Sequence, residues 1–218
     1  MVQINLPKNS EVTKGKYYQD KTGSKNIRKV NVYRWDPSTE ENPRLDTYEV
    51  DMDNCPSKVL DVLNKIKNEI DPTLTFRRSC REGICGSCAM NIDGVNTLAC
   101  LKPVEEVRGT VKIYPLPHMP VIKDLIVDME PFFDSYKKIM PYLVNENEPG
   151  KRERLQSPEE RDKIEDTTKC ILCAACTTSC PVFWTADSYI GPAAIVNAHR
   201  FIFDSRDEGS KQESYYCF

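Results

Sequence analysis

The alternation of apolar and polar residues predicts two strands near the start of the chain. Residues 29–35 and 47–50 place apolar side chains at every second position, as strands with one face on a core do. Residues 57–70 instead repeat their apolar positions at the helical period, and Asp71-Pro72 ends that run. We therefore expect a half-buried sheet covered by one amphipathic helix.

A tight hairpin is predicted next along the chain. Residues 89–92 and 95–99 flank Asp93-Gly94, a dipeptide that favours a type I′ turn because both central residues need positive φ. Residues 111–114 supply a further strand. These segments add strands to the same sheet.

The second half of the chain has a helical pattern. Prolines within residues 115–120 indicate a stiff connector, after which residues 121–142 are predicted to be helical with a break at Glu130-Pro131. Two further helices are expected. One follows the capping box of Ser157 and Glu160 and leads into Cys170, and the other runs from Gly191-Pro192 to about Phe203.

This pattern divides the chain into a polar arm over residues 1–28, a sheet domain over 29–120 and a helical domain over 121–218. A length of 218 residues is enough for two compact domains. The net charge of −3 gives no reason to expect nucleic acid as a partner. No apolar stretch approaches the roughly 20 residues that span a bilayer, so membrane attachment is expected only through partners.

Ten cysteines suit a reducing compartment here, because no secretory leader opens the chain. Four of them form a C-x4-C-x2-C-x11-C run that begins like the plant-type run of 2Fe-2S proteins. The run consists of Cys80, Cys85, Cys88 and Cys100. Gly83 and Gly86 let the loop wrap closely, so that backbone N–H groups can reach cluster sulfurs. A zinc site is the alternative, although zinc usually takes two separated C-x2-C pairs.

A second run, C-x2-C-x2-C-x3-C-P, matches the bacterial ferredoxin pattern. It consists of Cys170, Cys173, Cys176 and Cys180, followed by Pro181. Three of its cysteines can hold three corners of a 4Fe-4S cluster, and the fourth serves a neighbouring cluster, so a partner cysteine run is expected. Only Cys217 follows in this sequence, and we interpret it as a free thiol; Cys55 is interpreted as a small core residue.

These segments resemble the iron-sulfur subunit of succinate dehydrogenase, a component of respiratory complex II. The resemblance is carried by residues 74–88, by 114–118, by 170–184 and by Gly191-Pro192-Ala193, and it covers nearly everything from Val30 to about Asp207. Fumarate reductase iron-sulfur subunits share the layout and are the nearest competitor.

The resemblance implies an α+β chain, with a β-grasp 2Fe-2S ferredoxin domain followed by an all-α ferredoxin-like domain that is short at its C-terminus. It implies a 2Fe-2S cluster on Cys80, Cys85, Cys88 and Cys100, a 4Fe-4S cluster on Cys170, Cys173 and Cys176, and a 3Fe-4S cluster reached by Cys180. Electrons from FAD in a flavoprotein subunit would pass through these clusters to a quinone held with membrane-anchor subunits. The expected location is the matrix side of the mitochondrial inner membrane, or the cytoplasmic face of a bacterial plasma membrane.

The sequence departs from the family at two places. Trp184 matches the first of two adjacent tryptophans common in mitochondrial members. Thr185 replaces the second and offers a quinone a hydroxyl donor but no indole surface. The final cysteine run is also missing, which we interpret either as truncation or as a subunit split between two proteins, the second supplying that run. A mainly structural or assembly role is the alternative function.

Other polar residues have ordinary interpretations. No catalytic acid, base or nucleophile is predicted, so catalysis would arise in the assembled complex. His118 is expected to make a structural hydrogen bond, and His199 with Arg200 to face solvent, a partner or the quinone. The arginines near the first cysteine run, Arg77, Arg78 and Arg81, either offset thiolate charge or solvate the loop.

Overall fold

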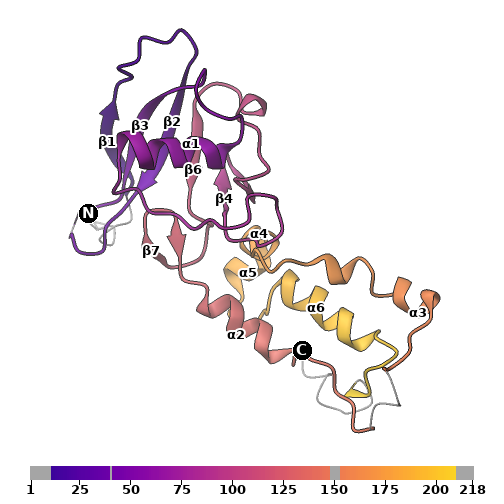
Figure 1. Ribbon diagram of the computed structural model, residues 1–218. Helices are drawn as coiled ribbons and strands as arrows, with labels where there is room; N and C mark the ends of the chain where they lie inside the picture. The colour runs from indigo at the N-terminus through magenta and orange to yellow at the C-terminus, as the bar shows by residue number, and fades with distance from the viewer. Residues whose placement is uncertain (1–10, 40, 148–152, 210–218) are drawn as a thin grey trace, which may run out of the picture. The chain divides into compact units, whose positions relative to one another are not determined.

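A computed structural model describes residues 11–39, 41–147 and 153–209 of the chain. Its contacts divide the chain into two compact units, Met1–Asp128 and Met129–Phe218. The first is built on a sheet and the second on helices (Figure 1). The predicted α+β class, with the sheet unit first, is confirmed.

The described residues of the first unit form a six-stranded mixed sheet in the order β1-β3-β2-β6-β4-β5. Its strands are β1 Thr13–Tyr18, β2 Ile27–Arg34, β3 Arg44–Asp51, β4 Ala89–Ile92, β5 Val95–Leu98 and β6 Val111–Tyr114. Strand β2 is antiparallel to β3 and parallel to β6, so strands from opposite ends of this unit's sequence lie side by side. This is the β-grasp arrangement.

The hairpin predicted around Asp93-Gly94 is present. Strands β4 and β5 pair antiparallel with Ile92 opposite Val95 and Ala89 opposite Leu98. Asp93 and Gly94 have φ angles of 50° and 85°, as a type I′ turn requires. The two-residue turn therefore fixes the register of the two strands.

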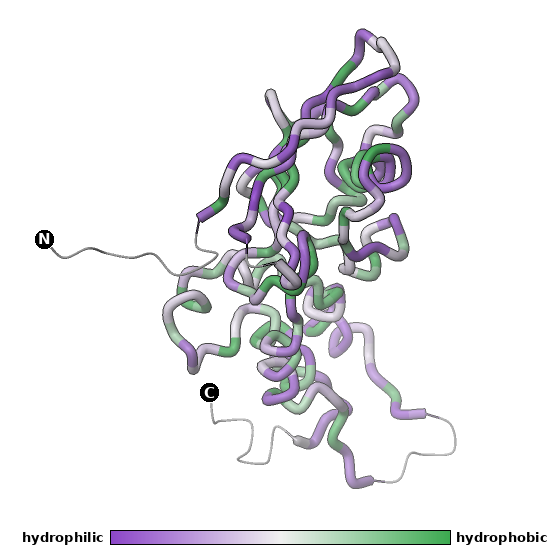
Figure 2. Tube along the Cα trace, turned by 90° about the vertical axis from the view of Figure 1, so that its left-hand side faces the viewer, coloured by the Kyte–Doolittle hydropathy of each residue, from purple (hydrophilic) through white to green (hydrophobic). Residues whose placement is uncertain are grey.

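The core of the first unit lies between the sheet and helix α1, Val59–Lys65. Figure 2 shows this helix nearly end-on, with its hydrophobic side toward the strands and its hydrophilic side away from them. Leu63 of the helix and Val30, Val32 and Val50 of the sheet are 0% exposed. Burying each such side chain contributes roughly 1.5–3 kcal/mol.

The sequence predicts one helix over residues 57–70, and the structure differs from this in the last turn, which is wider than an α-helical turn. It is a π-helical turn, η1 (Ile66–Ile70), closed where the Asp71 N–H donates to the Ile66 carbonyl at 2.7 Å. The wide turn accommodates an extra residue, and single π turns of this kind are rare. It brings the carboxylate of Asp71 against Arg34.

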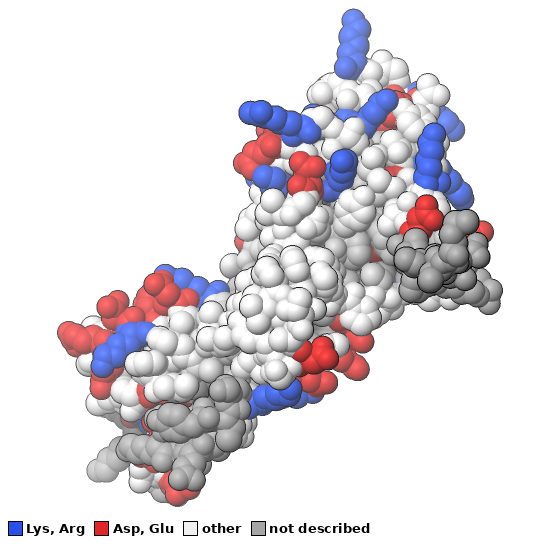
Figure 3. Space-filling model, turned by 180° about the vertical axis from the view of Figure 1, so that it is seen from behind, with Lys and Arg blue, Asp and Glu red and all other residues white. Residues whose placement is uncertain are grey.

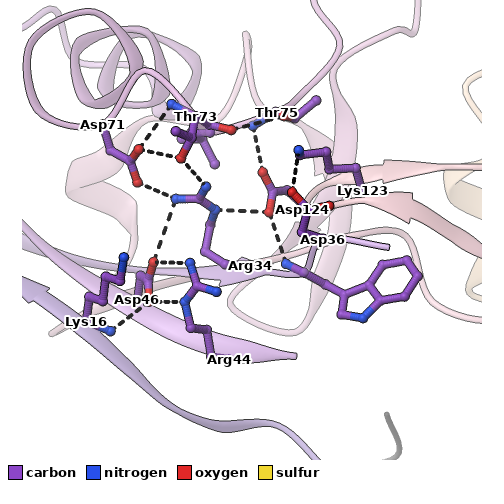
Figure 4. Close-up of polar contacts among 12 residues, drawn as sticks. Lys16, Arg34, Asp36, Arg44, Asp46, Asp71, Thr73, Thr75, Lys123 and Asp124 are labelled. Atoms are coloured by element: carbon purple, nitrogen blue, oxygen red, sulfur yellow. Dashed lines mark hydrogen bonds and ion pairs between the residues drawn. The ribbon is translucent and has the colours of Figure 1, made fainter. Parts of the chain in front are cut away.

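Arg34, at the end of β2, is only 3% exposed and is surrounded by carboxylates (Figure 4). It forms ion pairs with Asp71, with Asp124 at 3.0 Å and with Asp46 at 3.7 Å. It also donates to the hydroxyls of Thr73 at 2.8 Å and Tyr48 at 2.7 Å. The guanidinium thus joins β2, β3 and two later segments of the chain.

The surroundings hold these groups in their charged forms. Burial alone would raise the pKa of Asp71, but hydrogen bonds from Thr73, Arg34 and Tyr48 outweigh it and leave this pKa well below its usual value. Burial likewise opposes the charge of Arg34, and the neighbouring Tyr48 and Asp124 raise its pKa further above its usual range. The network is therefore an interdependent set of charges.

The segment after the prolines is a hairpin rather than the start of the predicted helix. Strands β7 (Val121–Lys123) and β8 (Ile126–Val127) pair around Asp124, which has a φ of 46°. The Asp124 carboxylate accepts hydrogen bonds from the N–H groups of Trp35 and Thr75, at 3.0 and 2.9 Å. These bonds tie the hairpin to the first unit, so the boundary falls after Asp128 and not after Pro120.

The prediction of a polar arm over residues 1–28 was wrong for its described part. Strand β1 runs parallel to β3, and the Lys16 N–H donates to the Asp46 carboxylate at 2.7 Å. Gly15 permits this approach, because a Cβ there would lie 2.1 Å from the same carboxylate. This edge strand is held by backbone hydrogen bonds and by a carboxylate, not by buried apolar side chains. Its sequence therefore lacks the alternation of apolar residues from which a strand is predicted. Residues 1–10 lie outside the described residues.

The second unit consists of short helices around a small apolar core. Its described elements are α2 Glu130–Lys138, α3 Pro158–Asp162, η3 Thr167–Lys169, α4 Ala175–Thr178, α5 Pro181–Thr185 and α6 Pro192–Ile202. The core joins Ile139, which follows α2, to Ala194, Ala198 and Phe201 of α6. The capping box of Ser157 and Glu160 is confirmed, but the helix it opens ends at Asp162, and the 3-10 turn η3 precedes Cys170.

Charge is mixed over the surface. On the face seen in Figure 3, the basic side chains of the sheet unit are interspersed with acidic ones, in keeping with the small net charge of −3. Within the described residues, no helix is both long enough and apolar enough to cross a membrane.

Replacing Arg34 by methionine should destabilise the first unit strongly. The change leaves Asp46, Asp71 and Asp124 buried without their shared cation, and removing one partner of a buried ion pair costs about 3–5 kcal/mol. Lys123→Met is the matched control, because it breaks only the partly exposed 2.7 Å ion pair with Asp36 and should cost at most about 1 kcal/mol. Urea unfolding of both variants measures this; equal costs would contradict the role given to Arg34.

Candidate metal centres

The first cysteine loop lies just before β4 and is shaped by left-handed residues. Arg81, Gly83 and Gly86 have φ angles of 66°, 80° and 71°. These turns direct the N–H groups of Ile84 and Cys85 at the Cys80 sulfur, both at 3.3 Å. The loop therefore wraps closely enough for its backbone N–H groups to reach the sulfur of Cys80, a candidate ligand.

Cys85 lies on the exposed side of this loop. Its sulfur lies 3.1 Å from the Ser87 hydroxyl. Hydrogen bonds with Ser87, and then with Cys80, lower the pKa of the Cys85 thiol to about 6. Because a thiolate is the form that binds metal, this thiol is prepared to act as a ligand at neutral pH.

The other two cysteines of the first run are brought together by the hairpin. Cys88 precedes β4 and Cys100 follows β5, and the Ala99 N–H donates to the Cys88 carbonyl at 3.1 Å. The two residues are 3% and 5% exposed. Burial raises the pKa of the Cys88 thiol to about 11, and Cys100 interacts with it directly. The hairpin therefore brings Cys88 and Cys100 together as a buried pair, while Cys80 and Cys85 lie nearer the surface.

Neighbouring side chains fix the loop to the rest of the unit. Arg81 forms an ion pair with Asp61 of α1, and Arg77 donates to the Val127 carbonyl of β8 at 2.8 Å. Both arginines therefore have specific partners in the structure, while Arg78 is exposed. The apolar side chains of Ile84 and Leu101 are 65% and 51% exposed beside the loop.

The second cysteine loop also contains left-handed residues, although none of them is glycine. Leu172 and Ala174, on either side of Cys173, have φ angles of 55° and 63°. This conformation is costly for residues with a Cβ and is found mostly where the surroundings enforce it. Burial raises the pKa of the Cys173 thiol. The Asn197 side chain of α6 donates to the Cys170 sulfur at 3.4 Å.

The remaining cysteines of this run lie at the ends of short helices. Cys176 is exposed within α4, and Cys180 is the N-cap of α5, ahead of Pro181. Tyr189 interacts with Cys180: partial burial, and then the charge of Cys180, raise the pKa of its hydroxyl.

All nine cysteines of the described residues are free, and Cys217 lies outside those residues. Cys55 is half-buried, and burial raises its pKa. Across residues 11–39, 41–147 and 153–209, no three His, Cys, Asp or Glu side chains are grouped so as to hold a single metal ion. The contacts described above instead join the first four cysteines in two pairs.

The two residues predicted near a quinone have their donors engaged within the second unit. The Trp184 indole N–H donates to the Thr178 carbonyl at 2.8 Å, and the Thr185 hydroxyl donates to the Pro181 carbonyl at 3.1 Å. Trp184 is 41% exposed, so its ring still presents apolar surface. The hydrogen-bond donor that the sequence attributes to Thr185 is used inside its own helix.

The two histidines have the following surroundings. His199 stacks on Phe203 with ring centroids 4.3 Å apart, and the Arg200 guanidinium lies over Phe201. His118 has a φ of 58° and lines a cavity of about 370 Å³ with Tyr33 and Tyr114.

Sequence reasoning missed Asn197. Its signal was available, because a polar residue interrupts an apolar stripe of α6 that includes Ala193, Ala194 and Phe201. A buried amide in such a stripe needs partners, and a cysteine sulfur is one of them.

Comparison with known proteins finds a family that matches mostly the first unit and relatives that match most of the chain. Residues 29–134 match the family described as 2Fe-2S iron-sulfur cluster binding domain. The succinate dehydrogenase iron-sulfur subunit of Paracoccus denitrificans is 56% identical over 211 residues, which are 96% of this chain and 82% of that protein. A chain of the Mycobacterium smegmatis Sdh1 complex in the apo form superposes with a TM-score of 0.71 at 25% identity, over 89% of this chain and 85% of that chain.

Gly83→Ala should lower the 2Fe-2S absorbance of the protein more than its control does, because the Leu101 side chain must move to admit the new Cβ. The new Cβ would lie 2.8 Å from Leu101 Cδ1 and would also strain a residue with a φ of +80°. Gly94→Ala is the matched control, because its φ is +85° but nothing lies within 4 Å of the new Cβ. The control should cost only about 1–2 kcal/mol and keep its iron. Iron, sulfide and visible absorbance are the measurements, and equal losses in both variants would contradict the expected difference.

Proposed function

This chain belongs to the family of succinate dehydrogenase iron-sulfur subunits, and from that membership we propose that it carries electrons from a flavoprotein subunit to a quinone. The path would run through a 2Fe-2S cluster in the first unit and through 4Fe-4S and 3Fe-4S clusters at the second. The observation that carries the proposal is the pairing of Cys80 with Cys85 and of Cys88 with Cys100 on one loop and one hairpin.

The four cysteines of the first run suit a 2Fe-2S cluster. Each iron of such a cluster needs two thiolates, and the contacts supply two pairs. The N–H groups aimed at Cys80 would stabilise negative charge on its sulfur. The low pKa of Cys85 adds a ligand that is ready to bind, whereas Cys88 and Cys100 exclude water from their side of the site.

In the second unit, Cys170, Cys173 and Cys176 would supply three ligands of a 4Fe-4S cluster. Cys180 would serve the 3Fe-4S cluster. The remaining ligands of both would come from a further cysteine run, either on a longer form of this chain or on a companion protein. The left-handed conformations of Leu172 and Ala174 support this assignment, because left-handed residues in a turn are typical of backbone loops whose N–H groups surround an anionic group.

The chemistry of a bound iron-sulfur cluster is the uptake and release of one electron at a time. The residues of this chain hold the ligands, orient N–H donors toward sulfur and limit access of water. No substrate acid or base is assigned to them, since succinate oxidation would take place at the FAD of the flavoprotein subunit.

The partners in this proposal are the flavoprotein subunit and membrane-anchor subunits, and the chain would be peripheral to the membrane. Trp184 and Thr185 are the proposed quinone neighbours, with the exposed indole ring as the feature that supports them. Because the Thr185 hydroxyl is bonded within α5, we expect this contact to be apolar. The proposed location is the matrix side of the mitochondrial inner membrane or the cytoplasmic face of a bacterial plasma membrane.

Two cysteine substitutions test the assignment of clusters. In the assembled complex, Cys88→Ala should lose the 2Fe-2S signal in electron paramagnetic resonance after dithionite reduction, and Cys173→Ala should lose the 4Fe-4S signal. Cys55→Ala is the control, because Cys55 lies outside both runs and should leave every signal unchanged.

If either unit contained zinc in place of iron and sulfide, the cluster proposed for that unit would be overturned. The same would follow if Cys173→Ala kept the full 4Fe-4S signal. Metal and sulfide analysis of the unsubstituted complex provides the reference for both outcomes.

A further inference from the structure

Asn197 is a buried amide whose contacts include a proposed cluster ligand. It lies in α6, is 1% exposed, and its Nδ2 is 3.4 Å from the Cys170 sulfur and 2.9 Å from the Ala193 carbonyl. The amide nitrogen has two N–H groups, so it can serve both acceptors at once. One bond lies within the helix, and the other crosses to the cysteine loop.

The bond within the helix does not by itself explain an asparagine here. The buried face of α6 is otherwise apolar, with Ala194, Ala198 and Phe201 packed in the core. Asparagine is a poorer helix former than leucine or alanine, and burying its amide carries a desolvation cost. The contact with Cys170 is what an apolar residue at this position would lack.

We propose that Asn197 donates a hydrogen bond to the Cys170 sulfur in the cluster-loaded protein and thereby raises the reduction potential of the 4Fe-4S cluster. The inference rests on the proposed function, in which Cys170 is a ligand of that cluster. Asn197 does not touch the iron, so it is a positioning and tuning residue.

The physical reason is electrostatic. Reduction adds one electron and so places more negative charge on the sulfur ligands. An N–H group directed at such a sulfur stabilises the reduced form more than the oxidised form, and hydrogen bonds to sulfur are among the determinants of cluster potential. Burial strengthens the effect because the surroundings have a low dielectric constant. In each transfer the cluster gains one electron and then passes one electron on. The amide of Asn197 keeps both of its N–H protons throughout.

Two variants separate the bond to sulfur from the bond within the helix. Asn197→Leu removes both donors and fills a similar volume. Asn197→Thr keeps a hydroxyl that can donate to the Ala193 carbonyl, as Thr178 donates to the Ala174 carbonyl in α4 at 2.9 Å, but its shorter side chain does not reach Cys170. Ile195→Ala, on the exposed side of the same helix, is the matched control.

Redox titration of the assembled complex, followed by low-temperature electron paramagnetic resonance, measures the effect. In both Asn197 variants we expect the 4Fe-4S midpoint potential to fall, by up to the equivalent of about a tenfold change in the reduction equilibrium, which is about 59 mV for one electron. The 2Fe-2S potential in the same samples should not move, and Ile195→Ala should match the unsubstituted complex.

The outcomes distinguish this inference from the proposed function. Asn197→Thr with a full 4Fe-4S content and an unchanged potential would overturn the role of Asn197 and leave the cluster assignment standing. An unsubstituted complex without a 4Fe-4S signal would overturn the cluster assignment, and the role of Asn197 with it. Should Asn197→Leu fail to assemble, Asn197→Thr alone still decides between these results.

Discussion

The first unit depends on one buried cation. Arg34 can remain charged at 3% exposure only because carboxylates from three separate segments converge on it, at Asp46, Asp71 and Asp124. A buried charge without partners costs several kcal/mol, so each segment must adopt its native position for the others to be stable there. The wide π turn before Asp71 and the left-handed turn at Asp124 are the local distortions that make this convergence possible.

The same network extends toward the first cysteine loop. Asp124 accepts the N–H group of Thr75, a few residues ahead of Cys80, and Arg77 bonds to the Val127 carbonyl of the same hairpin. The chain therefore enters the cysteine loop from a segment with fixed backbone bonds. The loop itself is then free to use left-handed residues and N–H groups for its ligands, since its entry point does not have to be stabilised by the cluster.

Much of the fold could be predicted from sequence because it depends on patterns of residues that are close together in the chain. The strand around Val32, the type I′ turn at Asp93-Gly94 and the capping box at Ser157 each depend on neighbouring residues alone. What could not be predicted depends on distant partners. Strand β1 is held by Asp46, which lies some thirty positions away. The cysteine spacings predicted candidate ligands but not Asn197, whose contact with Cys170 appears only when α6 lies beside the cysteine loop.

The 90 residues between Arg34 and Asp124 also set the order in which the unit can form on the ribosome. Chains are synthesised at about 5–20 residues per second, so Asp124 is added several seconds after Arg34. Cys80, Cys85, Cys88 and Cys100 are all synthesised within that interval. The unit therefore closes only after all four thiols have been made, and until then its hydrophobic face and its cysteines are accessible together. Vectorial synthesis gives this unit an interval in which its four candidate ligands exist but its complete fold does not.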